Sequence, residues 1–557
     1  MTVRAVRPSR AGTVPWPEDV VAEYVAKGYW QGVPLGRHFL AAADAAPDAV
    51  ALVDGDTRLT FHDLAARADG AALRLRDLGL RADDRVLVQL PNRWEFVVLF
   101  LACLRSGVLP VLALPAHRRH ELSYLAEHAE AAAIAVPATF KGFDHRALAA
   151  DIAADHPTVT HLLVSGGGQP GDVDLRELCA PAADPVAARA ALDREEPGSR
   201  DTALFLLSGG TTALPKLIAR THDDYAHYVH RTVDAAGYGP DTVNLVALPV
   251  GHNFSLGVLL ATLFEGGRVV FGSPEPEQAF ELVERESVTH SGLVPAVAQR
   301  WLEHRAAAPG HDLGTLRGLM VGGSRLPDHV AARIGPELGC ALQQGYGMAE
   351  GLVCLTRPAE GDEVACHTQG RPLSEGDELL VVDEAGEPVP AGEPGVLLTR
   401  GPYTPRGYYR APEQNARVFT PDGWYRTGDI VRLRPDGNVV VEGREKDMIN
   451  RGGEKVSAEE VENLALQVDG VLMAAAVAMP DAELGERVCL YVVPRTGREV
   501  RLADVLDLMR RVGVARYKLP ERLVVVDALP LTGMQKVDKK ALRADVEQRL
   551  AGERAAV

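Results

Sequence analysis

The segment at residues 207–216 reads Leu-Ser-Gly-Gly-Thr-Thr-Ala-Leu-Pro-Lys, and it constrains the fold of this chain more than any other. It follows an apolar run at 203–207 that is typical of a buried strand. Paired glycines let the backbone turn tightly and approach a ligand closely. Backbone N–H groups, hydroxyls and an ammonium in one loop favour the binding of phosphate oxygens. The candidate phosphate ligands are Ser208, Gly209, Gly210, Thr211, Thr212 and Lys216.

The spacing of this loop differs from that of a Walker A loop. A plain surface turn is the alternative interpretation of any glycine-rich segment. The rest of the chain therefore has to decide between a nucleotide site and a turn.

Length and charge exclude several classes of protein. A chain of 557 residues is too long for one core, so we expect at least two domains. The net charge of −17 argues against non-specific binding to nucleic acid. No apolar run is long enough to span a membrane, and the basic start is not followed by the apolar segment of a signal peptide. The cysteines form no C-x-x-C pair, and a cytoplasmic location is the simplest expectation.

Alternating helix and strand patterns predict an α/β fold. In the first part, residues 60–78 and 93–106 read as helices and 85–89 as a strand. Residues 147–201, rich in Ala, Asp, Pro and Gly, are expected to form loops. A second α/β run follows, with strands expected at 244–250, 268–271 and 318–321.

Short strands and turns at 376–443 indicate a β-rich subdomain, and the end of the chain reads as a small α+β domain. We expect strands at 471–479, 487–494 and 522–527, and helices at 502–512 and 539–550. The charged, non-periodic segment 443–447 suits an exposed hinge. The predicted division is an N-terminal core domain at 1–443, a hinge at 444–447 and a mobile C-terminal domain at 448–557.

Four further segments carry polar or glycine-rich chemistry after the first loop. Each alone has an ordinary interpretation: a turn, a capped loop or a solvated lysine. Their joint occurrence in this order favours a nucleotide site. They are Gly322-Gly323-Ser324, Gly345-Tyr346-Gly347-Met348-Ala349-Glu350, Tyr425-Arg426-Thr427-Gly428-Asp429 and the segment at 530–538 that contains Lys536.

Together these segments resemble the core motifs of the superfamily of acyl-CoA synthetases, peptide-synthetase adenylation domains and firefly-type luciferases. The resemblance runs from about residue 16 to the C-terminus. Additional segments are similar to the stand-alone aryl-acid–AMP ligases of siderophore assembly, which activate 2,3-dihydroxybenzoate or salicylate. These segments include Gly28-Tyr-Trp-Gln-Gly32, Lys216-Leu-Ile-Ala-Arg-Thr-His222, His252-Asn253 and Ile449-Asn-Arg-Gly-Gly-Glu-Lys455.

The resemblance implies a reaction in which an aryl carboxylate attacks the α-phosphate of ATP and pyrophosphate leaves. It assigns catalysis to Lys536, Glu350, Lys216 and His252, with Glu350 as the Mg²⁺ ligand. The loop residues would hold the β- and γ-phosphates and Tyr346 would stack on adenine. Asp429 would accept hydrogen bonds from the ribose, and Arg444 would bind ribose or phosphate. The remaining nucleotide-binding residues would be Gly322, Gly323, Ser324, Gly345 and Gly347.

The resemblance implies a second step in which a phosphopantetheine thiol of an acidic aryl carrier protein attacks the acyl carbon. The small domain would rotate about Lys446, withdrawing Lys536 and bringing in a thiol tunnel at Gly452, Gly453 and Lys455. Basic residues late in the chain are a candidate docking face for the carrier, with a solvated helix face as the alternative. They are Arg510, Arg511, Arg516, Lys518, Arg522, Lys539 and Lys540.

The acid pocket departs from the subfamily pattern. The implied pocket residues are His252, Asn253, Ser255, Gly345 and Val353, with Asn253 on the ortho-hydroxyl of the acid. Gly345 stands where the subfamily usually has Val, which would leave room for a larger or differently substituted ring, with compensating repacking around the usual acid as the alternative. Because Asn253 is retained, an ortho-hydroxylated or ortho-amino aryl acid is the expected substrate. Ala213 stands where the loop usually has Gly, which would stiffen it.

Three rival functions are open at this point. An aryl- or acyl-CoA ligase shares the first half-reaction and differs in the acceptor thiol. A non-catalytic nucleotide-binding scaffold is disfavoured because Lys536, Glu350 and Asp429 are all present. A luciferase-like oxygenase is the most distant of the three.

Overall fold

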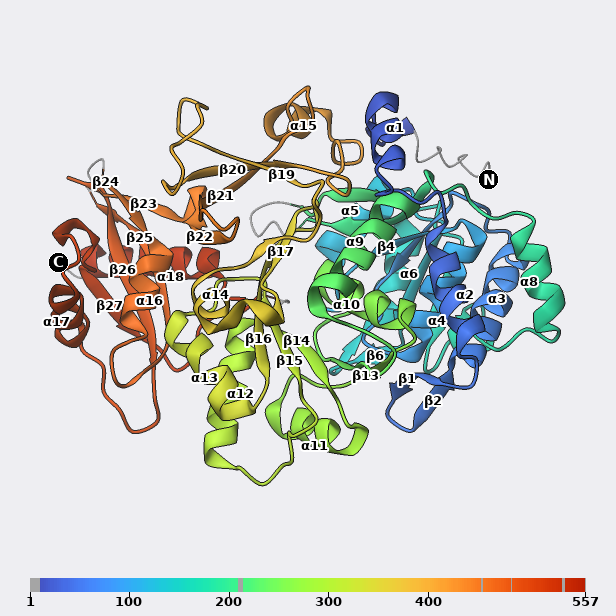
Figure 1. Ribbon diagram of the computed structural model, residues 1–557, viewed down its shortest axis with the longest axis horizontal. Coiled ribbons are helices and arrows are strands. Elements are labelled where there is room, and N and C mark those ends of the chain that lie inside the picture. The colour runs from blue at the N-terminus through green and yellow to red at the C-terminus, as the bar shows by residue number, and fades with distance from the viewer. Residues whose placement is uncertain (1–10, 209–213, 452–453, 482, 533–535, 556–557) are drawn as a thin grey trace.

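The computed structural model describes residues 11–208, 214–451, 454–481, 483–532 and 536–555. It has the predicted mixed α/β fold, with a large N-terminal domain and a smaller C-terminal domain (Figure 1). Figure 1 shows the C-terminal elements, in orange and red, at the opposite side of the molecule from the blue elements of the N-terminus. The α-helices of the N-terminal part are α1 (Glu18–Ala26), α2 (Leu35–Ala45), α3 (Phe61–Asp77), α4 (Trp94–Ser106), α5 (Arg119–His128), α6 (His145–Asp155), α7 (Leu175–Leu178), α8 (Pro185–Asp193), α9 (His222–Ala236), α10 (Asn253–Phe264), α11 (Pro276–Glu286), α12 (Pro295–Ala307), α13 (Asp328–Leu338), α14 (Gly361–His367) and α15 (Pro412–Val418).

A seven-stranded sheet has the order β11-β10-β4-β3-β5-β8-β9. Its neighbours pair in parallel except β10 and β11, which form an antiparallel pair at one edge. Its strands are β3 (Arg85–Val88), β4 (Leu109–Leu112), β5 (Ala133–Pro137), β8 (His161–Ser165), β9 (Val173–Asp174), β10 (Thr202–Leu207) and β11 (Leu217–Thr221). A short ribbon of β6 (Thr139–Phe140) and β7 (Phe143–Asp144) lies beyond β5 in the chain.

A nine-stranded sheet has the order β18-β17-β16-β15-β14-β12-β13-β1-β2. Its central strands pair in parallel, and β2, β17 and β18 are antiparallel edges. Helices α9 and α10 lie between this sheet and the seven-stranded one, where they contribute to a shared apolar core (Figure 1). Its strands are β1 (Val50–Asp54), β2 (Thr57–Thr60), β12 (Val243–Val246), β13 (Arg268–Phe271), β14 (His290–Leu293), β15 (Gly318–Gly322), β16 (Ala341–Gly347), β17 (Val353–Leu355) and β18 (Arg371–Pro372).

The β-rich region predicted at 376–443 is a four-stranded antiparallel sheet of β19 (Glu378–Val382), β20 (Gly395–Arg400), β21 (Tyr425–Leu433) and β22 (Val439–Arg444). A 3₁₀ turn, η3 (Glu445–Asp447), then leads into the C-terminal sheet. The C-terminal elements are β23 (Met448–Arg451), β24 (Glu454–Ser457), α16 (Ala458–Ala465), β25 (Val471–Asp481), β26 (Gly485–Pro494), α17 (Leu502–Val512), β27 (Arg522–Val525) and α18 (Lys539–Ala555).

Capping side chains begin the helices that the apolar spacing predicts. Thr60 and Asp63 form a reciprocal capping box at the start of α3, and Thr221 and Asp224 form another at the start of α9. Each box satisfies two backbone N–H groups that lack a partner within the helix. The predicted strand 268–271 and helix 502–512 are confirmed at their stated boundaries.

The prediction of loops at 147–201 is wrong, because α6, β8, β9, α7 and α8 occupy much of it. Two of the aspartates that suggested loops are helix N-caps: Asp174 and Asp184 each accept a backbone N–H at the start of α7 and α8. Asp144, just before this stretch, caps α6 in the same way. Between such caps, the alanines favour helix.

The strand predicted at 244–250 is too long, because β12 ends at Val246. Beyond Val246, the backbone bonds to the side-chain amide of Asn92 and not to a neighbouring strand. Asn92 Nδ2 donates to the carbonyls of Val246 and Leu248, and Asn92 Oδ1 accepts the N–H of Val250. These bonds turn the chain toward α10.

All six cysteines are free and buried, and burial raises the pKa of every one of these thiols. Within the described ranges, no helix combines the length and the apolar character needed to cross a membrane.

Candidate active site

The predicted phosphate loop connects the antiparallel strands β10 and β11, and its ends are tied together. Ser208 N donates to the carbonyl of Lys216 at 3.0 Å, and Lys216 N donates to Ser208 Oγ, also at 3.0 Å. Five residues of the loop lie outside the described residues: Gly209, Gly210, Thr211, Thr212 and Ala213. The expectation of a stiffer loop concerns Ala213 and therefore also falls outside them. The two hydrogen bonds hold the backbone of Ser208 next to that of Lys216.

Tyr408, which the sequence did not single out, contacts both Lys216 and Glu350. The Lys216 ammonium is 5.1 Å from the ring centroid of Tyr408. The Tyr408 hydroxyl donates to Glu350 Oε1 at 2.7 Å and lies 3.2 Å from the hydroxyl of Tyr425. Burial raises the pKa of Glu350. A carboxylate held this way beside a phosphate loop suits a hard cation that also takes phosphate oxygens.

The glycine-rich segments at 322–324 and 345–347 are adjacent in space. Gly322 at the end of β15 pairs with Gly345 in β16, and a Cβ on residue 322 would lie 3.1 Å from the Gly345 carbonyl oxygen. Gly323 has a φ of +93°, which side chains rarely adopt, and Ser324 beside it is exposed. The two strand ends therefore present bare backbone, as the motifs predict for close approach of a ligand.

Asp429 connects two of the segments that are predicted to bind the nucleotide. Its carboxylate accepts the Tyr346 hydroxyl on Oδ2 at 2.6 Å and pairs through Oδ1 with Arg444 Nε at 2.7 Å. Asp429 and Arg444 are register partners in β21 and β22. The side chain of Asp429 is buried, whereas that of Arg444 is half exposed. Tyr346, Asp429 and Arg444 thus form one connected group.

Lys536 reaches this region from the C-terminal domain. A Cβ on Gly323 would lie 3.0 Å from Lys536 Cε and 3.5 Å from its Nζ. Burial and the nearby Arg444 guanidinium lower the pKa of Lys536 to about 8. Burial and the Lys536 ammonium lower the pKa of His252 to about 3, so this imidazole is neutral at physiological pH. His252 Nδ1 accepts the N–H of Phe254, which leaves the ring hydrogen on Nε2.

The predicted acid-side residues gather at the start of α10. Asn253 and Ser255 are both buried, and Asn253 Oδ1 accepts a hydrogen bond from the Tyr225 hydroxyl of α9. Val353 lies in β17, where a Cβ on Gly347 would come within 2.9 Å of its side chain. A Cβ on Gly345 would lie 3.4 Å from Leu355 Cδ1. Leu355 therefore lines part of the space that a side chain at 345 would take.

The predicted hinge and tunnel residues lie where the four-stranded sheet leads into the C-terminal elements. Lys446 is in η3, and burial together with Arg444 lowers its pKa. Its neighbour Asp447 pairs with Arg543 of α18 at 3.2 Å. Gly452 and Gly453 lie outside the described residues, and Lys455 is in β24 opposite Asn450.

The structure thus brings together Ser208, Lys216 and Glu350 on one side, and the 322–324 and 345–347 segments with Asp429, Arg444 and Lys536 on the other. Sequence reasoning missed Tyr408, Tyr225 and Arg220. Arg220 lies in the segment 216–222, and its position between a phosphate loop and a helix was the available signal. Tyr408 and Tyr225 act through contacts that no local pattern reveals.

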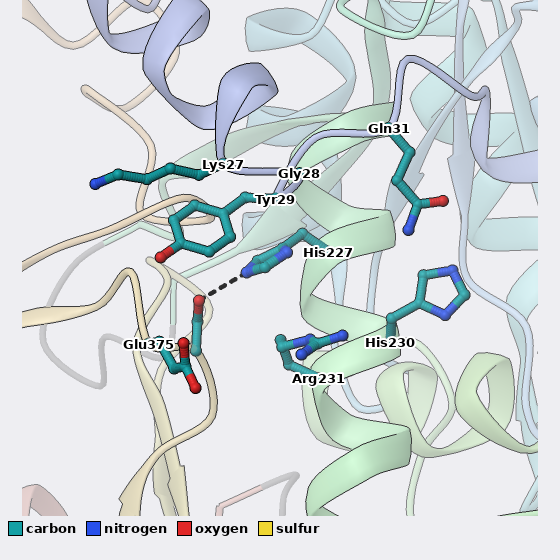
Figure 2. A pocket seen from close by; sticks show the side chains of 9 residues that line it. Lys27, Gly28, Tyr29, Gln31, His227, His230, Arg231 and Glu375 are labelled. Carbon is teal, nitrogen blue, oxygen red and sulfur yellow. Dashed lines mark hydrogen bonds between the residues drawn. The ribbon is translucent and has the colours of Figure 1, made fainter.

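A cavity of about 240 Å³ lies elsewhere, at the junction of the segment after α1 with α9 and the loop after β18. Figure 2 shows that the His227 side chain points to this loop, where it bonds Ser374 at 2.8 Å, and that Arg231 and His230 border the cavity. None of the predicted site residues lines it. Across the described part of the chain, no three His, Cys, Asp or Glu side chains gather as a metal site.

The paired α/β sheets, the glycine-rich strand ends and a lysine supplied by a small C-terminal domain define an adenylate-forming enzyme. The sequence profile of the AMP-binding enzymes matches residues 39–409, and that of the AMP-binding enzyme C-terminal domain matches residues 460–536. The chain belongs to the AMP-binding enzyme family. This finding confirms the superfamily that the motifs resemble.

Relatives match over nearly the whole chain. A 2-hydroxy-7-methoxy-5-methyl-1-naphthoate–CoA ligase of Streptomyces carzinostaticus is 57% identical, covering 97% of this chain and 98% of the relative. A salicylyl-CoA synthase/salicylate adenylyltransferase of a Streptomyces species is also 57% identical, covering 96% and 98%. The 2,3-dihydroxybenzoate-AMP ligase of Bacillus subtilis is 45% identical, covering 97% and 98%. The apo structure of Mycobacterium smegmatis MbtA is 41% identical, with a TM-score of 0.73 and coverage of 96% of this chain and 99% of that one.

Proposed function

We propose that this enzyme activates an aryl carboxylic acid with ATP, forming aryl-AMP and releasing pyrophosphate. The aryl group is then transferred to the phosphopantetheine thiol of an aryl carrier protein, in siderophore or peptide natural-product biosynthesis. The observation that carries the proposal is the position of Lys536, which contacts Gly323 on the nucleotide side and lies near His252 on the acid side.

In the first step an oxygen of the carboxylate attacks the α-phosphorus, and the bond to pyrophosphate breaks. Two anions meet, so the site must supply positive charge and fixed positions. Lys536 is assigned to the α-phosphate and carboxylate oxygens, and Lys216 and Ser208 to the outer phosphates with Gly209, Gly210, Thr211 and Thr212. His252, neutral with hydrogen on Nε2, is assigned as a donor beside Lys536.

Enzymes of the AMP-binding family use ATP and Mg²⁺. Glu350 would hold the ion, because its carboxylate is fixed by Tyr408 and lies on the side of Lys216. A single carboxylate with phosphate oxygens is a common way to bind Mg²⁺. When bound, the ion neutralises charge on the phosphates.

On the nucleotide side, Tyr346 is assigned to adenine and Asp429 with Arg444 to the ribose. Both oxygens of Asp429 have protein partners, so ribose hydroxyls that bond Asp429 compete with Tyr346 and Arg444. The bare backbone of Gly322, Gly323, Ser324, Gly345 and Gly347 lies alongside.

For the second step, the sulfur of the thiol attacks the acyl carbon and AMP leaves. We infer a core at 1–443, a hinge at 444–447 and a mobile domain at 448–557. The short turn η3 between the two sheets supports this division. Rotation about Lys446 would break the Arg495–Glu303 pair, 2.9 Å long, and the bond from Gln299 to the Leu472 carbonyl. The thiol would then enter past Gly452, Gly453 and Lys455.

An aryl acid is supported by the names of the relatives, which specify salicylate, dihydroxybenzoate and a substituted naphthoate. The naphthoate relative favours the larger-ring option raised by Gly345. Leu355 beside Gly345 leaves repacking around a one-ring acid as the alternative.

CoA is a second candidate for the thiol that accepts the aryl group. It is favoured by the two relatives at 57% identity, which are named as a CoA ligase and a CoA synthase. For a carrier protein, the expected basic face is partly neutralised, since Lys518, Arg522 and Lys539 pair with Glu460, Glu553 and Glu462. Arg511, Arg516 and Lys540 are exposed and would carry most of the docking charge.

The test is ATP–pyrophosphate exchange with 2-hydroxybenzoate, 2,3-dihydroxybenzoate, 2-hydroxy-1-naphthoate and hexanoate, followed by loading of the best acid onto CoA or a holo-carrier. We expect exchange with the aryl acids and little with hexanoate. Exchange with hexanoate alone would refute the aryl assignment. Loading of CoA but not of any holo-carrier would assign the enzyme to the CoA ligases.

A further inference from the structure

Tyr225 of α9 and Asn253 of α10 form a hydrogen bond inside the core. The Tyr225 hydroxyl donates to Asn253 Oδ1 at 2.9 Å, and the tyrosine side chain is fully buried. The two residues lie on different helices, so the bond fixes the Asn253 amide relative to α9. Among the described residues, Asn253 Nδ2 donates to no other protein group.

The direction of this bond follows from what a buried phenol requires. Burial raises the pKa of Tyr225, so the group is a neutral hydroxyl with a hydrogen to donate. A buried O–H without an acceptor costs stability, and Asn253 Oδ1 is the acceptor here. Turning the amide over would place an N–H₂ against the phenol and leave the phenol hydrogen without this acceptor. The Asn253 oxygen therefore faces Tyr225, and its N–H₂ faces away from it.

Tyr225 is itself held from the other side. The guanidinium carbon of Arg220 lies 4.9 Å from its ring centroid, a cation–π contact. Arg220 is buried, pairs with Asp224 at 2.7 Å, and donates to the Ala349 carbonyl at 3.4 Å. The support of Tyr225 thus extends to the residue next to Glu350.

We propose that Tyr225 is a positioning residue that orients the Asn253 amide, so that the acid pocket offers a hydrogen-bond donor to the ortho substituent of the aryl acid. The inference rests on the proposed function. It narrows the substrate class to acids whose ortho group can accept a hydrogen bond, such as a hydroxyl oxygen. An ortho-amino group is a poor acceptor, because its nitrogen lone pair is delocalised into the ring. Its N–H groups would also face the N–H groups of the Asn253 amide.

The test compares 2-hydroxybenzoate, 2-aminobenzoate and benzoate in ATP–pyrophosphate exchange. We expect wild type to prefer the hydroxy acid to the amino acid, and Tyr225→Phe to reduce this preference about tenfold, mainly through KM of the hydroxy acid. Benzoate has no ortho substituent, so its kcat/KM and the KM of ATP should change much less. Tyr228→Phe is the matched control, since Tyr228 is a buried tyrosine of the same helix whose hydroxyl lies against Gly257.

Asn253→Asp is the second variant, because it replaces the donor by an acceptor of the same shape. It should make 2-aminobenzoate the better of the two ortho-substituted acids, although the added charge lowers both rates. An unchanged preference in Tyr225→Phe, or equal losses for all three acids, would overturn the positioning role. Absence of exchange by wild type with any aryl acid would instead overturn the proposed function and this inference with it.

Discussion

Lys536 packs directly against Gly323, the residue that follows β15. A side chain at 323 would have to share space with Lys536 Cε at 3.0 Å and with Val294 Cγ1 at 3.4 Å. The small domain therefore docks with its lysine in contact with bare backbone of the large domain.

Gly323→Ala should slow adenylate formation about tenfold, because the added methyl group displaces Lys536. The positive φ of +93° adds backbone strain of its own. Gly339→Ala is the control for strain, since Gly339 has a φ of +74° with no atom within 4 Å of the added Cβ. ATP–pyrophosphate exchange measures both variants, and equal effects would mean that contact with Lys536 is unimportant.

Lys536→Ala should abolish adenylate formation and spare thiol transfer from supplied aryl-AMP. The reason is that the lysine contacts Gly323 in the present orientation of the small domain, and the proposed rotation would withdraw it before thiol transfer. Single-turnover assays of each half-reaction measure the split. Lys27→Ala changes an exposed lysine just after α1 and should affect neither half-reaction. Equal loss of both half-reactions in Lys536→Ala would contradict the assignment.

The rate of adenylation should fall at high pH. The pKa of Lys536 is lowered to about 8, so the ammonium is present below pH 8 and lost above it. We expect kcat/KM for the acid to decline about tenfold per pH unit beyond this value, since kcat/KM reports groups of the free enzyme. Lys536→Arg keeps its charge at these pH values and should lack the decline, though at lower activity. A decline at the same pH in both would point to another group.

Tyr408→Phe should raise the Mg²⁺ concentration needed for half-maximal activity several-fold. The variant keeps the ring under Lys216 but removes the hydrogen bond to Glu350 Oε1, which then orients less well. A Mg²⁺ titration of exchange activity measures the shift. Tyr409→Phe is the control, because the neighbouring hydroxyl is buried without a hydrogen-bond partner in the described residues. A shift of the same size in Tyr409→Phe would show that Glu350 is not involved.

Local patterns predicted the elements that depend on local chemistry. Helix α17 and strand β13 have the predicted boundaries because the signals that define them are local: an apolar run for β13, and apolar spacing with Asp504 and Gly513 at the two ends for α17. The end of β12 could not be predicted, since it depends on the amide of Asn92, far away in the chain. In the region 147–201, composition could not distinguish a loop aspartate from the helix N-caps Asp174 and Asp184.

The residues of the candidate site also fall into two groups: those that local motifs predict and those that depend on distant contacts. Gly322, Gly345 and Asp429 could be found because their motifs have recognisable chemistry at strand ends, and their roles stay predictions until tested. Tyr408 and Tyr225 could not be found. Each has meaning only through a partner on another element, Glu350 for the first and Asn253 for the second.

The burial of every cysteine has a consequence for an enzyme that makes a reactive acyl-adenylate. Such a product acylates thiolates, and Cys354 stands opposite Tyr346 in the pairing of β16 with β17. This thiol is fully buried, and burial raises its pKa well above the ordinary value, so it carries no thiolate at neutral pH. Burial thereby protects this cysteine from acylation by the product of its own enzyme.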